Sequence, residues 1–296
     1  MADRNVHFFG GGGADGGRAL RDLLGGKGAN LAEMAKLGLP VPPGFTISTE
    51  VCAAFSSSGS IPEPVRAEIS QAVSRLEEVT GASLGDGSPL LLSVRSGARV
   101  SMPGMMDTVL NLGLDDETVE SLARATGDRR FALDCYRRFC AMYGSVVLGL
   151  GDEPFDALLE QLKRERYAAS DSELNAADLA KLVADSKALI FERTGTALPG
   201  DPRDQLTGAI EAVFRSWNNP RAVTYRQAPV LRRSLGHDGL FEVVILGRHK
   251  HVEPVGGADA VLQLGQVARR DRRLQQRWLV RRGDESPRLV ARIIRG

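Results

Sequence analysis

The sequence has few aromatic residues and almost no net charge, and each shortage argues against a class of protein. Aromatic side chains make up 5% of the 296 residues, which argues against a stacking surface for single-stranded nucleic acid. The formal net charge of +1 gives no general attraction to nucleic acid or to an anionic membrane. No apolar run approaches the roughly 18 residues of a membrane span. We therefore expect neither a nucleic-acid-binding protein nor a membrane protein.

Cysteine is also scarce. The three cysteines, Cys52, Cys135 and Cys140, are odd in number and lack the spacing of a metal site. The N-terminal stretch MADRNVHFFGGGG has no apolar run long enough for a secretory signal. Reduced thiols are typical of cytosolic proteins. The sequence therefore predicts a cytoplasmic protein with no metal site of its own.

Apolar periodicity predicts an α/β (α+β) body interrupted by a helical segment. Predicted strands cover Val6–Phe9, Gly44–Ser48, Pro89–Arg95, Thr108–Leu112 and Leu240–Leu246. Predicted helices cover Ala29–Leu37, Ile61–Thr80, Asp115–Thr126, Arg129–Leu148, Glu153–Tyr167, Ala176–Arg193 and Pro202–Trp217, with a further possible helix over Val261–Arg273. The domains expected are an N-terminal α/β part (1–112), a helical subdomain (113–200), a return to the body (201–227) and a tail (228–296).

The tail differs in character from the rest of the chain. It is rich in arginine, poor in lysine, and holds three of the four histidines. It could be a basic binding tail, or the out-of-frame or replaced end of a GC-rich reading frame. We favour the second interpretation, because the change is abrupt and no regular basic face appears.

A glycine-rich turn around Lys27 is the first candidate site. The stretch LLGGKGANLAEMAKLGLPVPPGFTIST puts Lys27 between Gly26 and Gly28 at the start of a helix. Free N–H groups and the helix dipole favour an anion there, phosphate above all. The segment lacks the spacing of a P-loop. A Gly-x-Gly-x-x-Gly match over 11–16 is weak, and a flexible surface loop is the favoured interpretation of it.

The stretch LLLSVRSGARVSMPGMMDTVLNLGL is the second candidate. Arg95 ends an apolar strand, where a guanidinium can clamp phosphate oxygens. Taken alone, Arg95 is more readily explained as a structural ion-pair residue. The loop at 102–106, MPGMM, is either a core loop or a lid over a ligand.

Four motifs together resemble the N-terminal nucleotide-binding domain of the pyruvate, phosphate dikinase family, which has the ATP-grasp fold. They are GGKGANLAEMAKLGLPVPPGFTIST, LLLSVRSGARVSMPGMMDTVLNLGL, RRFALDCYRRFCAMYGSVVLGL and FRSWNNPRAVTYR. The phosphoenolpyruvate synthases share the first motif and part of the second. The resemblance covers about residues 4–227 and implies an ATP-grasp-like first part with an inserted helical subdomain.

The resemblance also implies a reaction and a set of site residues. Family members turn ATP, phosphate and pyruvate into AMP, pyrophosphate and phosphoenolpyruvate through a phosphohistidine, with Mg²⁺. Lys27 and Arg95 match the phosphate-binding lysine and arginine of the family. Other residues would lie near the nucleotide: Gly26, Gly28, Ser96, Ser101, Met102, Gly104, Asp107 and Thr108.

The tail departs from the family pattern. The second half of the ATP-grasp, the phosphohistidine domain and the pyruvate barrel are not recognisable there, and His237, His249 and His251 do not inherit the phosphohistidine role. We therefore expect an ATP-binding fragment without catalytic residues of its own, whose missing domains could act in trans. The alternatives are a non-catalytic binding or regulatory module that reuses the scaffold, or one subunit of a split enzyme.

Overall fold

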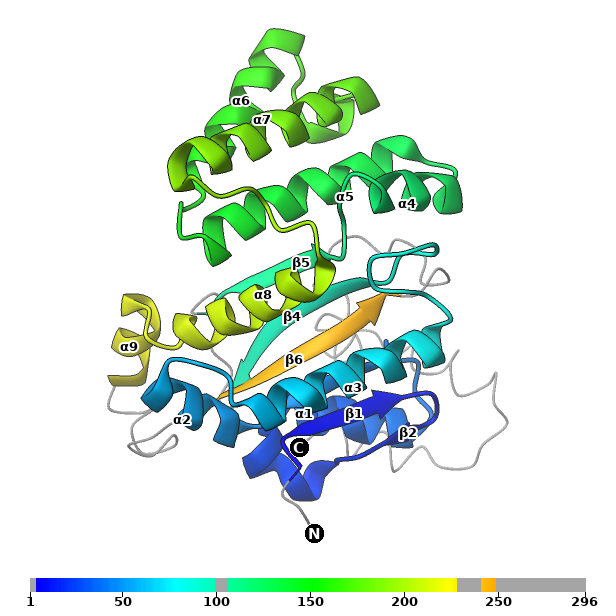
Figure 1. Ribbon diagram of the computed structural model, residues 1–296, viewed down its shortest axis with the longest axis vertical. Coiled ribbons are helices and arrows are strands. Elements are labelled where there is room, and N and C mark those ends of the chain that lie inside the picture. The colour runs from blue at the N-terminus through cyan, green and yellow to red at the C-terminus, as the bar shows by residue number, and fades with distance from the viewer. Residues whose placement is uncertain (1–3, 99–105, 228–240, 249–296) are drawn as a thin grey trace, which may run out of the picture. The chain divides into compact units, whose positions relative to one another are not determined.

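A six-stranded sheet organises the part of the chain that the computed structural model describes, namely residues 4–98, 106–227 and 241–248. All paired strands are antiparallel, in the order β2-β1-β3-β6-β4-β5 (Figure 1). The strands are β1 (Val6–Gly10), β2 (Gly13–Ala14), β3 (Gly44–Ile47), β4 (Leu91–Ala98), β5 (Thr108–Leu112) and β6 (Phe241–Arg248). A mixed α/β fold, as predicted, is confirmed.

The strand β6 comes from the segment that the sequence assigns to the tail. It lies between β3 and β4, so that Ile245 is paired with Phe45 on one side and with Val94 on the other. The strand predicted over 240–246 is observed as 241–248. An interior position in the sheet explains its apolar sequence VVIL, because both faces of the strand are covered.

The register gives the sheet two different faces. One face carries the apolar row Phe8, Phe45, Ile245, Val94 and Val109, with one residue from each of five strands. The opposite face carries the row His7, Thr46, Val244, Arg95 and Thr108, which we call the Arg95 row. Successive side chains along a strand point to opposite faces of the sheet. Each strand therefore contributes two consecutive residues, one to each row, and the two rows lie on opposite faces.

Helices cover both faces. The apolar face packs against α2 (Thr49–Ser58), α3 (Glu63–Thr80) and α8 (Pro202–Ser216) in one buried cluster. Within that cluster the rings of Phe55 and Phe214 are stacked at 5.2 Å. The opposite face is covered by α1 (Arg21–Lys36), whose Gly28 lies directly against the side chain of Thr46. A short helix, α9 (Pro220–Gln227), follows α8.

A helical insert separates β5 from α8 in the sequence and packs beside β5 (Figure 1). It consists of α4 (Thr118–Thr126), α5 (Arg129–Met142), a π-helical turn (Tyr143–Val147), α6 (Glu153–Arg166) and α7 (Ala176–Thr194). Its helices begin and end at cap residues. Asn175 and Asp178 form a capping box at the start of α7, and Gly195 ends that helix in the left-handed conformation.

One buried side chain ties the insert to the body. Gln205 of α8 is fully buried, and its Oε1 accepts from Gly113 N at 3.0 Å. Its Nε2 donates to Leu114 O at 3.1 Å and to Pro199 O at 2.8 Å. Gly113 and Leu114 lead into the insert and Pro199 leads out of it. The side-chain amide of Gln205 therefore bonds to both chain segments that connect the insert to the body. We call this set of three hydrogen bonds the Gln205 clamp.

Most predicted helices are observed within a few residues of their expected bounds, with one larger difference. The helix expected over 29–37 begins at Arg21 and contains a break at Gly25, where φ is 62° and ψ is −173°. Of the glycines expected to form a surface loop, the exposed Gly11 and Gly12, both at positive φ, connect β1 to β2 in a tight hairpin. The possible helix over 261–273 lies outside the described residues.

Among the described residues, no helix is long and apolar enough to cross a membrane.

Candidate functional site

The break in α1 creates the local geometry around Lys27. Glycine adopts the positive φ at Gly25 without steric penalty, and the chain then starts a second helical segment at Gly26. The N–H groups at the start of such a segment have no partner four residues earlier within it. The helix start expected from the GGKG motif is therefore present, but inside a helix that begins upstream at Arg21.

Lys27 joins the two motifs that the sequence singled out. Its half-buried side chain donates from Nζ to Ser96 O at 2.6 Å, across 69 residues of sequence. Ser96 is the neighbour of Arg95, which is also half-buried. Two cationic residues thus come from α1 and β4 to one region of the sheet, where a charged phosphate would accept stronger hydrogen bonds than a backbone carbonyl.

Asp107 has partners within the protein. Its N–H donates to Ser216 Oγ at 3.2 Å, and its Oδ2 accepts from Asn219 Nδ2 at 3.1 Å. These contacts join the MMDT part of the second motif to the motif FRSWNNPRAVTYR, which begins at the end of α8. Thr108 lies beside Arg95 in the Arg95 row. Ser101, Met102 and Gly104 lie outside the described residues, as do His237, His249 and His251.

The Arg95 row contains two polar residues that the sequence reasoning missed. His7 and Thr46 are paired across β1 and β3, and they are 6% and 1% exposed. His7 Nε2 donates to Arg4 O at 2.9 Å, while its Nδ1 has no hydrogen-bond partner. Burial lowers the pKa of His7, so the ring is neutral at pH 7. The polar residues in HFFG and FTIS were the available signal, but apolar content dominated the strand predictions.

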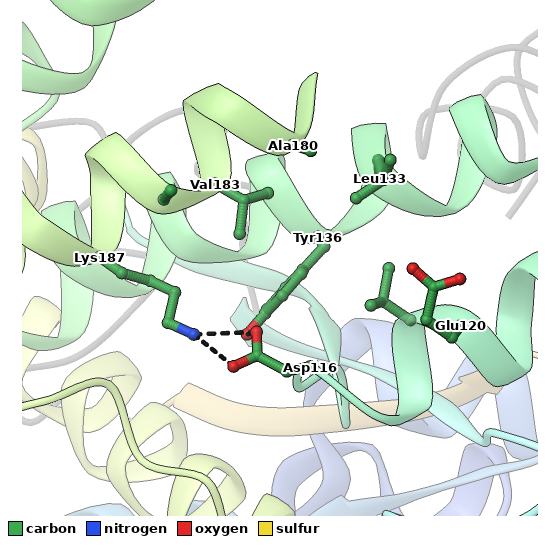
Figure 2. Close-up of a pocket in the computed structure, with 9 residues that line it drawn as sticks. Asp116, Glu120, Leu133, Tyr136, Ala180, Val183 and Lys187 are labelled. Atoms are coloured by element: carbon green, nitrogen blue, oxygen red, sulfur yellow. Dashed lines mark hydrogen bonds and ion pairs between the residues drawn. The ribbon is translucent and has the colours of Figure 1, made fainter. Parts of the chain in front are cut away.

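A hollow of about 430 Å³ lies in the helical insert, away from Lys27 and Arg95 in the sequence (Figure 2). Lys187 donates to Asp116 at 2.7 Å, and Tyr136 donates to the same carboxylate at 3.1 Å. The hydrogen bond from Lys187 lowers the pKa of Asp116, and burial raises that of Tyr136. The polar groups at this end of the hollow are therefore bonded to one another, and its remaining walls are largely aliphatic.

No group of three or more His, Cys, Asp or Glu side chains comes together as a metal site in the described part of the chain.

Together, the fold and the site define a class: a mixed α/β domain with a helical insert and with Lys27 and Arg95 close together on one side of its sheet. Comparison with family models makes this more specific. The pyruvate phosphate dikinase AMP/ATP-binding domain matches residues 21–83 and 57–235. The chain belongs to this family.

Curated relatives agree with that assignment. The chain is 53% identical over 223 residues to pyruvate, phosphate dikinase of Rhizobium meliloti strain 1021. It is 52% identical over 228 residues to pyruvate, phosphate dikinase 1, chloroplastic, of Arabidopsis thaliana, and 50% identical over 216 residues to the Clostridium symbiosum dikinase. These alignments cover 72–76% of this chain but only 24–25% of each relative. The chain therefore spans about a quarter of the length of those enzymes.

Proposed function

We propose that this domain binds ATP through its phosphate groups, with Lys27 and Arg95 as the cationic contacts. Membership of an AMP/ATP-binding family and the joining of Lys27 to the Arg95 strand support the proposal. The observation that carries it is the hydrogen bond from Lys27 Nζ to Ser96 O. Proteins catalyse phosphoryl transfer mainly by positioning the reacting groups and by neutralising the negative charge on the phosphoryl group. Cationic side chains held in fixed positions suit that task.

The finer fold assignment belongs to the same proposal. We infer that residues 4–227 correspond to the first part of an ATP-grasp domain, with the helical subdomain at 113–200. Gly26, Gly28, Ser96 and Thr108 would line the phosphate region. Magnesium, when bound with ATP, would neutralise phosphate charge. Such an ion is usually held by one or two carboxylates together with the phosphates, and we assign it no particular protein ligand.

The whole reaction is proposed from the relatives. Conversion of ATP, phosphate and pyruvate to AMP, pyrophosphate and phosphoenolpyruvate would need a phosphohistidine domain and a pyruvate site. By resemblance these lie in other domains, on the same polypeptide or in trans. A cytoplasmic location is part of the same proposal.

The first prediction tests Lys27. Calorimetric titration of Mg-ATP into the chain should show binding that Lys27→Ala weakens about tenfold or more, because a charge-assisted hydrogen bond is worth about 1.5–3 kcal/mol. Lys36→Ala is the matched control, since Lys36 is an exposed lysine of the same helix. Equal affinity of the two variants would refute the assignment of Lys27.

A further inference from the structure

Two buried hydroxyl groups under α1 have no hydrogen-bond partner. Thr46 Oγ1 and Ser48 Oγ both lack one, and the residues are 1% and 0% exposed. Ser48 stands at the N-cap of α2, where a serine usually accepts from the first turn, yet it makes no side-chain cap bond. A buried hydroxyl without a partner destabilises a fold, so two of them in one place call for an explanation.

Both hydroxyls lie beside the broken helix that carries Lys27. A Cβ atom built on Gly28 would be 2.7 Å from Thr46 Oγ1, so the backbone after Lys27 rests on this side chain. Next to Ser48, Thr49 Oγ1 donates to Asp22 O at 3.2 Å, in the first turn of α1. Thr46 therefore lies against the helical segment after the Gly25 break, and the residue that follows Ser48 is bonded to the segment before it.

Thr46 also belongs to the Arg95 row. It is paired with Val244, which is paired in turn with Arg95. The residue that supports Gly28 is consequently in the same row of the sheet as the proposed phosphate-binding arginine, with one strand between them. Any shift of the Gly25–Gly28 segment toward a phosphate would change what Thr46 touches.

We propose that Thr46 is a positioning residue for the nucleotide phosphates, acting through the Gly25–Gly28 segment. This rests on the function proposed above. When a phosphate binds at the start of the second helical segment, Lys27 moves from Ser96 O to the phosphate, and the segment adjusts. Thr46 Oγ then donates to a backbone carbonyl of that segment and holds Lys27 in place.

The energetic reason is the difference between the two states. A side chain influences ligand affinity only if its own interactions differ between the free and the bound protein. In the free state the Thr46 hydroxyl is buried and unpaired. A valine of the same shape would avoid that penalty, so the hydroxyl lowers the stability of the free protein and favours the state in which it is bonded.

A structural role is the rival explanation. His7 Nδ1, an acceptor in this tautomer, is also unpaired and belongs to the residue directly opposite Thr46. A hydrogen bond between Thr46 Oγ1 and His7 Nδ1 would satisfy both atoms without any ligand. In that case Thr46 stabilises the sheet alone, and its removal lowers stability without changing nucleotide affinity.

The second prediction separates these explanations with the full chain and Mg-ATP. Thr46→Val should raise the melting temperature in the absence of nucleotide by about 2 °C or more. The same variant should weaken Mg-ATP binding about fivefold or more, as expected for one lost hydrogen bond. Thr46→Ser keeps the hydroxyl and should stay within about threefold of wild-type affinity.

Thr80→Val is the matched control. Thr80 is a buried threonine of α3 whose Oγ1 donates to Leu76 O at 2.7 Å. Its replacement should lower the melting temperature and leave the affinity for Mg-ATP unchanged. Opposite signs of the stability change at the two threonines would support the proposal.

Several outcomes overturn it. A lower melting temperature for Thr46→Val with unchanged affinity would establish the structural role through His7. Unchanged affinity with a raised melting temperature would also exclude positioning. If wild type binds Mg-ATP and Lys27→Ala weakens binding while Thr46→Val does not, only this inference fails. If wild type does not bind, the proposed function fails and this inference with it.

Discussion

Lys27 depends on the two glycines that flank its helical turn. Gly25 adopts a positive φ of 62°, which a side chain would strain, and Gly28 lies so close to Thr46 that a Cβ there would be 2.7 Å from two side-chain atoms. The first glycine starts the new helical segment and the second lets it approach the sheet. The lysine reaches Ser96 because both conditions are met.

The third prediction concerns His7 and pH. Burial lowers the pKa of His7 below its ordinary value of 6.5, against smaller raising contributions from Arg4 and Asp15. Below pH 6.5 the His7 side chain is therefore protonated in the unfolded chain but stays neutral in the folded protein until the pH reaches its lowered pKa. Stability should fall as pH decreases from 6.5 toward the lowered pKa, by at most about 1.4 kcal/mol per pH unit from this group.

Urea unfolding of wild type and His7→Gln at several pH values between 5 and 7.5 measures this contribution. The glutamine can still donate to Arg4 O but does not titrate, so the difference in stability between the two proteins should shrink or reverse as pH falls. Parallel pH profiles would contradict the assignment of a neutral, buried His7.

At the scale of elements, most helix positions were predictable because apolar periodicity and caps are local signals. The helix α2 (Thr49–Ser58) was not predicted. Thr108–Leu112 was expected as a strand and is observed with those bounds. The break at Gly25 was not placed inside a helix, because GGKG is compatible with both a loop and a kink. The central place of β6 could not be inferred, since strand order depends on pairing between distant segments.

The fourth prediction tests the Gln205 clamp between the insert and the body. Gln205→Leu would leave Gly113 N–H and the carbonyls of Leu114 and Pro199 without the bonds they now make to Gln205. Unpaired buried backbone groups are costly, so we expect a loss of about 2–4 kcal/mol in the free energy of unfolding, measured with denaturant.

Gln161→Leu provides the control, because Gln161 is an exposed glutamine of α6 whose Nε2 donates to Glu165 of the same helix. Its replacement should change stability by no more than about 0.5 kcal/mol. If Gln205→Leu were equally mild, the clamp would contribute nothing measurable.

At the scale of the whole molecule, the fifth prediction concerns the complete reaction. The matched region is an AMP/ATP-binding domain that corresponds to about a quarter of the related dikinases. We expect this 296-residue chain, assayed alone with ATP, phosphate and pyruvate, to form no phosphoenolpyruvate. Phosphorus NMR of the reaction mixture measures the product directly.

The Rhizobium meliloti dikinase, 53% identical over the matched region, is the positive control. Phosphoenolpyruvate formation by this chain alone would overturn the proposal that the phosphohistidine and the pyruvate site lie in other domains. Formation only after addition of a second polypeptide would support a split enzyme.

The sequence by itself determined the family and most of the helices, and it singled out Lys27 and Arg95 as candidate site residues. These features follow from residue types and from the spacing of residues that are close together in the sequence. Only the tertiary structure decided what those residues face. It put Lys27 on Ser96, aligned Thr46 and His7 with Arg95, and made a strand from the presumed tail part of the sheet. Such contacts join segments far apart in sequence, and the free energy of burying them together selects the register.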